Sequence, residues 1–446
     1  MSMRIIRSLC LMVLALMAGA VSLPVGQSTV AEAAAGQATD CGKTWYNASM
    51  TVTPSGMITV KGSAEPIYLK DPSKEGIYKL KEAAAKGFQA YVGLSLKIAG
   101  VSYYDIGNHQ IIKAGGNVKY TAIPAKVKAC VDQAVFNHNV NTWVTEAKKL
   151  KTPLLRLAYL FTEIDKHVEY DWDLYIGTGG FAASHTGFGA IVNGLGVCDG
   201  YAEALKILLD KVGIPNRLIE GTARGEGHMW NLVKLDGLSY HVDPTWGDNY
   251  GNAFHYFLLP DQDMQRDHKW SGKTYATSDK YYFLSRDSID AFGVNFLDGT
   301  FYTGGGTIDK MRLDHSGSTQ ISPKGDYVFR YQQVYNNQIY YLTLDGVKRM
   351  DMDGGNAQLL TDTHGATNDF YVFNGKVYYT SFILYPDQPY SFELYQCNLD
   401  GSGLKLVHQF TDEEHDFDGF TVVHVGSHDA LYYYTNDKKM TELDKI

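Results

Sequence analysis

Pairs of adjacent aromatic residues recur in the last third of the chain, and this repeat constrains the possible folds most. The first three pairs begin 39 and 38 residues apart, and a fourth follows after a longer gap: Phe301-Tyr302, Tyr340-Tyr341, Tyr378-Tyr379 and Tyr432-Tyr433. An Asp follows each pair, at Leu313-Asp314, Met352-Asp353-Gly354, Leu399-Asp400-Gly401 and Leu443-Asp444. A repeat of about 40 residues with several strands and Asp-Gly turns is typical of propeller blades. We therefore predict an all-β, propeller-like repeat domain over residues 286–446.

Two alternatives stay open for this region. Aromatic strands of a β-sandwich also fit the pairs, and four repeats are few for a closed propeller, so an open array is compatible as well. The run that begins at Asp351 resembles only the start of a calcium loop. Because the remaining ligand positions are missing, we interpret it as turn chemistry.

The overall composition is that of a folded globular protein. Hydrophobic residues make up 45% of the 446 residues and charged residues 20%, and the length allows two or three domains. The formal net charge is −9 without a block of Lys and Arg, which excludes the usual electrostatic footprint for nucleic acid. The 32 Tyr and 45 Gly residues favour strands and turns over a helical bundle.

The first residues have the pattern of an export signal. Arg4 and Arg7 precede a short apolar stretch, Leu9–Val21, and A-x-A motifs end at Ala33 and Ala35. The apolar stretch is shorter than the about 20 residues of a spanning helix, although a short membrane anchor is the alternative. We expect a signal peptide over residues 1–35 and a secreted or cell-surface protein with no integral membrane association after cleavage.

Four cysteines remain once Cys10 leaves with the signal. Exported proteins can keep disulfides, so a bond is allowed among the others. If Cys198 must be a free thiolate, the favoured pair is Cys41 with Cys130, by elimination; two buried free thiols are equally compatible. Cys397 is interpreted as a small packing residue.

The chain before the repeats divides into two parts. Residues 36–125 are expected to be a mixed α/β segment, with strands near Met50–Val60, a helix over Glu75–Ala90 and short strands within Ile98–Tyr120. Residues 126–285 are expected to form an α+β domain. Its helical pattern extends to Val168, and a further helix begins at Cys198. Three strands should follow, at Arg217–Thr222, His228–Leu235 and Leu238–Asp243.

The helix that begins at Cys198 gives this cysteine a special environment. Gly213 stands where a C′ glycine ends a helix, and Pro215 follows it. A thiol in the first turn lies at the positive end of the helix dipole, near unpaired N–H groups. Such surroundings favour the thiolate, which is the nucleophilic form. The alternative is a structural cysteine.

The turn at Asp236-Gly237 predicts which residues meet across the two following strands. An Asp-Gly pair is a strong signal for a two-residue hairpin loop. In that register Trp230 faces Asp243, and His228, two residues before Trp230, lies on the same face. His228 is then the diagonal neighbour of Asp243, within side-chain reach. A slip of one residue would put the two on opposite faces.

Three sequence blocks carry a resemblance to a known superfamily. Gly196–Ala202, Gly227–Asn231 and Tyr240–Asp248 resemble the signature blocks of transglutaminase-like, papain-like proteins, and the tail blocks Tyr256–Leu258 and Asp267–Trp270 are similar to those of bacterial secreted members. The resemblance spans about residues 130 to 270.

The resemblance implies a catalytic triad. By it, Cys198 is the nucleophile, His228 the general base and acid, and Asp243 the orienting carboxylate. Many relatives have Gln after the cysteine where this chain has Asp199, which adds an anionic group beside the thiol.

The implied activity is that of a cysteine peptidase, amidase or acyltransferase acting on amide bonds through a thioacyl intermediate. Water or an amine would complete the reaction on a protein or peptide substrate, including one associated with the cell wall. No metal and no other cofactor is required. The alternative is an inactive binding module of the same fold for a surface protein or wall polymer, with the repeats serving in docking.

Further residues are candidates for contact with the substrate. Trp230, Trp246 and Tyr201 are predicted to line the cleft, with core packing as the alternative for both tryptophans. The backbone N–H of Cys198 supplies one donor of an oxyanion hole. For the second donor, Asn193 and Trp230 are near in the sequence, and nothing distinguishes them.

Overall fold

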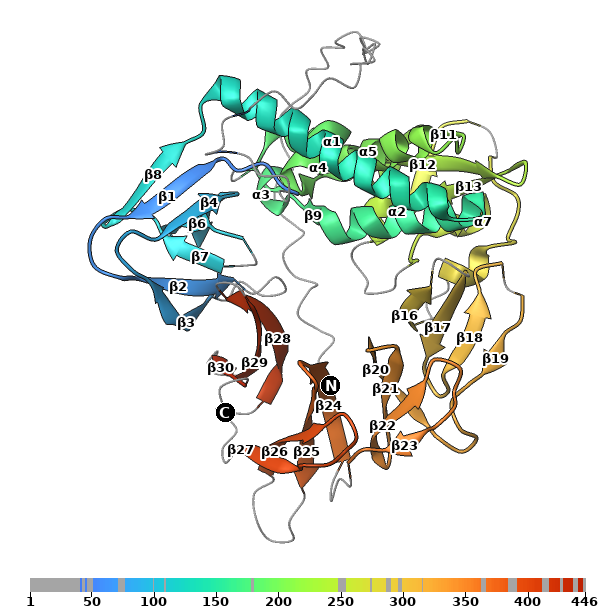
Figure 1. Ribbon diagram of the computed structural model, residues 1–446. Helices are drawn as coiled ribbons and strands as arrows, with labels where there is room; N and C mark the ends of the chain where they lie inside the picture. Colours follow the sequence, from blue (N-terminus) through green and yellow to red (C-terminus); the bar gives the residue numbers. More distant parts are fainter. Residues whose placement is uncertain are drawn as a thin grey trace. The chain divides into compact units, whose positions relative to one another are not determined.

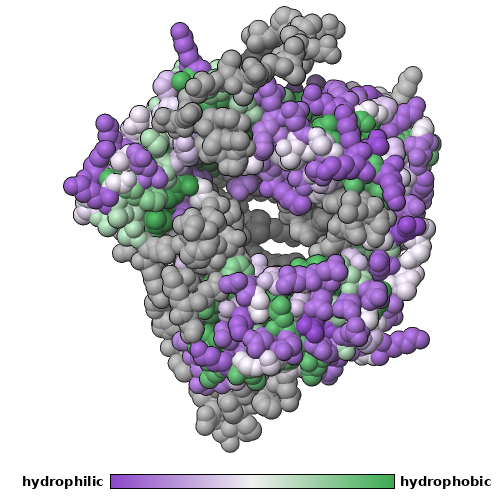
Figure 2. Space-filling view, viewed as in Figure 1, coloured by the Kyte–Doolittle hydropathy of each residue, from purple (hydrophilic) through white to green (hydrophobic). Residues whose placement is uncertain are grey.

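The computed structural model describes residues 41, 45 and 51–443, with short gaps (Figure 1). The gaps are 71–76, 99, 108–109, 178–179, 248–253, 273–274, 286–289, 296–298, 315, 362–365, 384–390, 411–416, 426–427 and 436–439. The expected signal peptide therefore lies outside the described residues. Within them, none of the helices has the length and apolar character needed to cross a membrane. Hydrophilic residues cover most of the face drawn in Figure 2, outside the grey atoms.

The described residues between 51 and 122 form two antiparallel sheets. One has the strand order β4-β1-β8 and the other β3-β2-β7-β6-β5. Buried Ile58, Val60, Val92 and Ile112 lie in one hydrophobic core with both sheets contributing. The strands are β1 Gly56–Val60, β2 Glu65–Lys70, β3 Ile77–Ala84, β4 Gln89–Val92, β5 Ser95–Ile98, β6 Val101–Asp105, β7 Gln110–Lys113 and β8 Val118–Ala122.

The helix predicted over Glu75–Ala90 is wrong. Its described part is strand β3, a turn and the start of β4, and β3 pairs with β2 so that Lys70 faces Ile77 and Glu65 faces Ala84. The residues of this segment are strong helix formers, which favoured a helix. Helix propensities differ by only roughly a few tenths of a kcal/mol per residue, so pairing with a neighbouring strand outweighs them. The mixed α/β segment is therefore all-β in its described residues up to Ala122.

A disulfide joins this part to the first helix. Cys41 is bonded to Cys130, 89 residues later in the chain, within helix α1 (Ala125–Lys149). This confirms the pairing inferred by elimination and removes the alternative of two free thiols. Cys198 and Cys397 are free, and Cys397 is buried, as expected of a packing residue.

Helices pack on one antiparallel sheet in the part from 125 to 285. The sheet has the order β14-β13-β12-β11-β15. Thr152 caps α2 by accepting the N–H of Leu155, and Gly213 ends α5 with a φ of 74°. The helical elements are α1, α2 Pro153–His167, α3 Trp172–Tyr175, η1 Ala182–His185, α4 Gly187–Asn193, α5 Cys198–Lys211, α6 Pro244–Gly247, α7 Asp261–Met264 and η2 Tyr282–Ser285. The strands are β9 Glu169–Tyr170, β10 Leu195–Gly196, β11 Asn216–Ala223, β12 Glu226–Leu235, β13 Leu238–Val242, β14 Phe257–Leu259 and β15 His268–Trp270.

Helix α5 is anchored by the apolar face predicted for it. Tyr201, Leu205, Leu208 and Leu209 are completely buried and belong to the main hydrophobic core. Burying a Leu side chain stabilises the fold by about 1.5–3 kcal/mol relative to exposure. This face therefore holds the helix, and with it Cys198 at its first residue, firmly against the sheet.

The β12–β13 hairpin has the predicted register. Leu235 faces Leu238 and Asn231 faces Val242, and both loop residues have positive φ, 51° at Asp236 and 81° at Gly237. Positive φ at both positions is the geometry of a type I′ turn, which an Asp-Gly pair adopts readily. The α+β fold expected for this part is thus confirmed.

The chain from Asp290 onward is all-β and is built of successive antiparallel sheets. Each aromatic pair lies in the second strand of its sheet, and the first three Asp-containing turns follow the third strand; Asp444 lies outside the described residues. The first sheet has β16 Asp290–Asn295, β17 Thr300–Gly304, β18 Asp309–Arg312 and β19 Thr319–Gln320; the second has β20 Val328–Tyr335, β21 Gln338–Thr343, β22 Gly346–Asp351 and β23 Gln358–Leu359. The third has β24 Ala366–Phe373, β25 Lys376–Ile383, β26 Ser391–Asn398 and β27 Lys405–Phe410; the last has β28 Phe417–Val425, β29 His428–Thr435 and β30 Met440–Glu442.

The aromatic pairs join neighbouring sheets. Adjacent residues of a strand point to opposite faces, so each pair supplies one ring to each side of its sheet. Tyr341 shares a core with Tyr302 of the preceding sheet, and Tyr340 shares another with Tyr379 of the following one. Phe301 of the first sheet belongs to the main core, together with α2 and α5. The repeats are therefore stacked sheets with shared cores, and closure into a propeller stays a prediction.

Replacing Cys130 by Ser should lower the free energy of unfolding by about 2–5 kcal/mol, because the unfolded chain regains the freedom that the cross-link removes. Urea unfolding of the oxidised wild type and of the variant measures this difference. Reduced wild-type protein is the matched control and should unfold at the urea concentration of the variant. Equal midpoints for all three samples would contradict the prediction.

Candidate active site

Cys198 is the first residue of α5, and its thiol is partly exposed. The N-cap residue Val197 makes no side-chain hydrogen bond to the first turn, so the thiol lies at an uncapped helix start. Gly200 lets this turn approach η1 closely, because a Cβ there would lie 2.1 Å from the carbonyl oxygen of Ser184. A partly exposed thiol at the positive end of a helix has the environment of a nucleophile.

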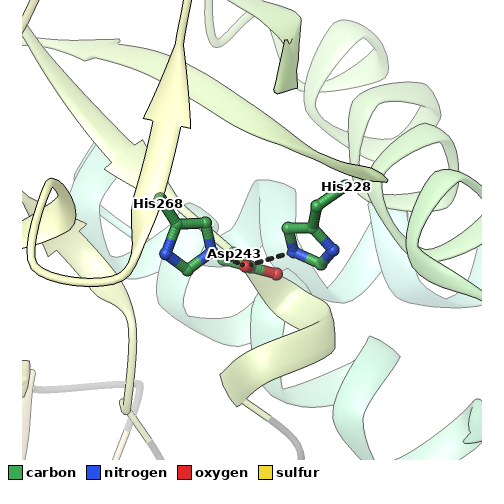
Figure 3. Close-up of side chains that lie close together, drawn as sticks. All are labelled: His228, Asp243 and His268. Carbon is green, nitrogen blue, oxygen red and sulfur yellow. Dashed lines mark hydrogen bonds and ion pairs between the residues drawn. The ribbon is translucent and has the colours of Figure 1, made fainter. Parts of the chain in front are cut away.

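His228 and Asp243 meet across the hairpin, as its register predicts. His228 Nε2 donates to Asp243 Oδ2 over 2.7 Å (Figure 3). The His228 side chain is 6% exposed and the Asp243 side chain is fully buried. A carboxylate oxygen can only accept, so this contact assigns a proton to Nε2 and leaves Nδ1 as the second ring nitrogen of His228.

The charge of His228 is stabilised by its neighbours. Burial alone would lower the pKa of His228, but the charge of Asp243, its hydrogen bond and a hydrogen bond with Cys198 together raise it to about 10. The imidazole is therefore cationic near neutral pH. Cys198 therefore lies close enough to His228 to influence the charge of its ring, and His228 lies between the thiol and Asp243 in this electrostatic sense.

Asp243 is held by four hydrogen bonds. Oδ2 accepts from Nε2 of His228 and, over 3.0 Å, from Nε2 of His268. Oδ1 accepts the backbone N–H groups of Thr245 and Trp246 at the start of α6. Burial would raise the pKa of Asp243, but the charges of the two histidines and their hydrogen bonds hold it below its ordinary value. The carboxylate is thus ionised and fixed in position.

The carboxylate of Asp199, next to Cys198 in the sequence, contacts groups other than the thiol. Its Oδ2 lies 2.8 Å from Nδ1 of His185, and its Oδ1 accepts the N–H of Gly200 over 2.9 Å. These contacts direct the carboxylate toward η1 and its own helix start, where the helix dipole favours a negative charge.

The remaining predicted contact residues differ in their exposure. Trp230 is completely buried, and its indole N–H donates to Nδ1 of His241; Tyr201 is also completely buried, and its hydroxyl donates to the carbonyl of Val168. Neither has a surface on which a substrate can rest. Trp246 is partly buried beside the His228 ring, 5.9 Å between centroids, under the guanidinium of Arg224. Asn193 is half-buried at the end of α4.

Two residues of the site were missed in the sequence. His268, in β15, contacts Asp243 from 25 positions away, and only the tail block hinted at it. Tyr170, in β9, pairs with Gly196 of β10 just before Cys198. Burial first, and then the proximity of Cys198, raise the pKa of Tyr170, so its hydroxyl lies in the electrostatic range of the thiol.

Two imidazole nitrogens and one carboxylate oxygen lie close together in this site. His228, Asp243 and His268 each offer one atom, all within 4.8 Å of one another, and such atoms are also zinc ligands. Here the two nitrogens share Asp243 Oδ2 through hydrogen bonds, which account for the short distances.

Comparison with known proteins identifies the central part of the chain. Residues 141–244 match the model of the Transglutaminase-like superfamily, as the sequence blocks implied, so the chain contains a transglutaminase-like core followed by a large all-β region. The matched range includes Cys198, His228 and Asp243. No curated protein matches the chain.

Among solved structures, the chain is similar to a crystal structure of a TGase, with 15% identity over 33% of this chain and 44% of that one, and a TM-score of 0.23. A nidogen/laminin complex shares 12% identity over 51% and 78% of the chains, and BamB from Moraxella catarrhalis 11% over 48% and 66%; both have TM-scores of 0.24. The chain thus spans less than half of the TGase chain.

The His228–Asp243 pair should make stability depend on pH. Because the pKa of His228 rises from 6.5 to about 10 on folding, its contribution is complete below about pH 6.5 and is lost as the pH rises through about 10. His228→Gln keeps a hydrogen-bond donor without a titrating charge. Urea unfolding between pH 6.5 and 10 should show a steeper loss for the wild type than for this variant; parallel curves would refute the assignment.

Proposed function

We propose, on the premise that residues 141–244 form a transglutaminase-like core, that this chain is an exported cysteine enzyme acting on amide bonds. The observation that carries the proposal is the hydrogen bond of His228 to Asp243, with Cys198 close enough to contribute to the raised pKa of His228. A base that is oriented by a third group and lies near a nucleophile is the usual signature of covalent catalysis.

The reaction proceeds in two balanced steps. The Cys198 sulfur attacks the amide carbonyl, the C–N bond breaks, and His228 gives its proton to the leaving amine. Water or a primary amine then attacks the thioacyl carbon, His228 takes the proton of that nucleophile, and the C–S bond breaks to restore the cysteine. Asp243 stays ionised throughout and supports the cationic form of His228.

Two groups support the developing oxyanion in this proposal. The backbone N–H of Cys198 is one, at the positive end of α5. The hydroxyl of Tyr170 is the second, because it lies near the thiol and its strand pairs beside the start of α5.

Tyr170→Phe should therefore lower kcat about 10²-fold, since the variant loses one oxyanion donor and keeps the ring. Its thermal unfolding should be nearly unchanged, because the ring contacts with Trp172 and Tyr201 remain. Tyr175→Phe is the control, as this hydroxyl donates to Glu226 instead. Wild-type kcat in Tyr170→Phe would exclude Tyr170 as the donor.

The remaining parts of the chain fit export and docking. The amino-terminal signal pattern and the Cys41–Cys130 disulfide both favour an oxidising, extracellular location. We assign the repeats after Asp290 to substrate docking on a protein, peptide or wall polymer. The competing hypothesis is an inactive binding module. A labelled thiol-reactive probe tests whether the cysteine is reactive, and mass spectrometry of a peptide library, with and without a primary amine, tests for turnover. Together these two experiments separate the hypotheses.

Substitutions of Cys198, His228 and Asp243 should differ in their effects. Cys198→Ala should abolish turnover, because no thioacyl bond can form. His228→Ala should cost nearly as much, since base and nucleophile act as a unit, and Asp243→Ala should cost less. Product formation from the peptides measures each loss. Turnover by a folded Cys198→Ala variant would refute the proposed mechanism.

A further inference from the structure

A second buried histidine holds Asp243 from the side opposite His228. His268 is the first residue of β15, which pairs with β11 at Ala223. Its side chain is fully buried, and Nε2 lies 3.0 Å from Asp243 Oδ2. Figure 3 shows the two rings on opposite sides of the same carboxylate. The two rings therefore share one acceptor oxygen.

The other nitrogen of His268 also meets a carboxylate. Nδ1 lies 2.6 Å from Oδ1 of Asp267, whose Oδ2 accepts the hydroxyl of Tyr256. The ionised Asp243 carboxylate only accepts hydrogen bonds, so Nε2 of His268 donates to it. Carboxylates and imidazoles thus alternate along Asp267, His268, Asp243 and His228.

Aromatic rings surround His268. The rings of Trp230, Trp246 and Tyr256 lie 5.1, 4.7 and 5.4 Å from the His268 ring, between centroids. Among the described residues, the titratable groups around His268 are Asp243, Asp267, His228 and Tyr256, with His241 in electrostatic range. In such a low-dielectric site, a carboxylate held by fixed donors keeps its position at little reorganisation cost.

We propose that His268 is a positioning residue: by donating to Asp243 Oδ2, it fixes the carboxylate so that His228 is aimed at Cys198. This inference rests on the proposed function, because His268 acts through Asp243 and touches no substrate. Without this donor, Oδ2 keeps only His228, and the carboxylate can turn about its remaining bonds. His228 would then be held less firmly in its cationic form beside the thiol.

The test measures the rate of Cys198 alkylation by iodoacetamide between pH 6 and 10. At pH 10 a thiol with an ordinary pKa of about 8.5 is already largely ionised in every variant, so this rate serves as the reference, whereas the rate at pH 6 depends on the cationic His228. His268→Leu removes the donor at similar volume and should lower the ratio of the pH 6 to the pH 10 rate about tenfold. His268→Gln, which keeps an N–H near the position of Nε2, should restore the ratio to within about threefold.

His241→Gln is the matched control. His241, in β13 of the same sheet, is as buried as His268, but it contacts Asp261 of α7 over 2.8 Å and makes no hydrogen bond to Asp243. It should lose stability comparably and keep the wild-type ratio. A purely structural role for His268 predicts an unchanged ratio in all folded variants, and that result would overturn the proposal.

One further variant and the choice of assay keep the test decisive. If His268→Leu does not fold, Asp267→Asn decides, because a weakened anchor on Nδ1 should also lower the ratio, and an unchanged ratio overturns the proposal. Alkylation needs no substrate, so the result stands even if the wild type turns over no peptide, which would refute only the proposed function.

Discussion

The carboxylate of Asp243 is the point on which the candidate site depends. A buried anion is costly unless every lone pair finds a donor. Here two imidazoles share one oxygen, and two backbone N–H groups of α6 hold the other. The hairpin, β15 and the start of α6 must therefore all be in place before the charge is stable. The orientation of His228, which is set by its hydrogen bond to Asp243, therefore depends on the folding of the whole sheet.

Much of this arrangement was predictable because it is local in the chain. The Asp236-Gly237 turn determines the hairpin register, and the register brings His228 to Asp243. Likewise, the helix that begins at Cys198 follows from its apolar face and from Gly213. Short-range turn chemistry and periodicity suffice for both, since no distant part of the chain competes for these residues.

The parts that could not be predicted depend on contacts distant in sequence. His268 reaches Asp243 only because β15 pairs with β11, and no local sequence pattern predicts that pairing. Strand β3 was predicted to be a helix because its residues have high helix propensity, but pairing with β2 outweighs that propensity. Trp230 looked like a cleft residue, yet its indole N–H is committed to His241 inside the core. In each case the competing interaction comes from another element.

The shared aromatic layers of the repeats bear on how the chain unfolds. Tyr341 and Tyr302 fill one layer, and Tyr340 and Tyr379 fill the next, so in the described residues the first three repeat sheets share their cores with a neighbouring sheet. Unfolding of one sheet would expose an apolar face on each neighbouring sheet. Because Phe301 belongs to the main core, the first repeat sheet is linked in the same way to the helices. Melting should then be cooperative across the repeats, and evolution can lengthen or shorten such an array only by whole sheets.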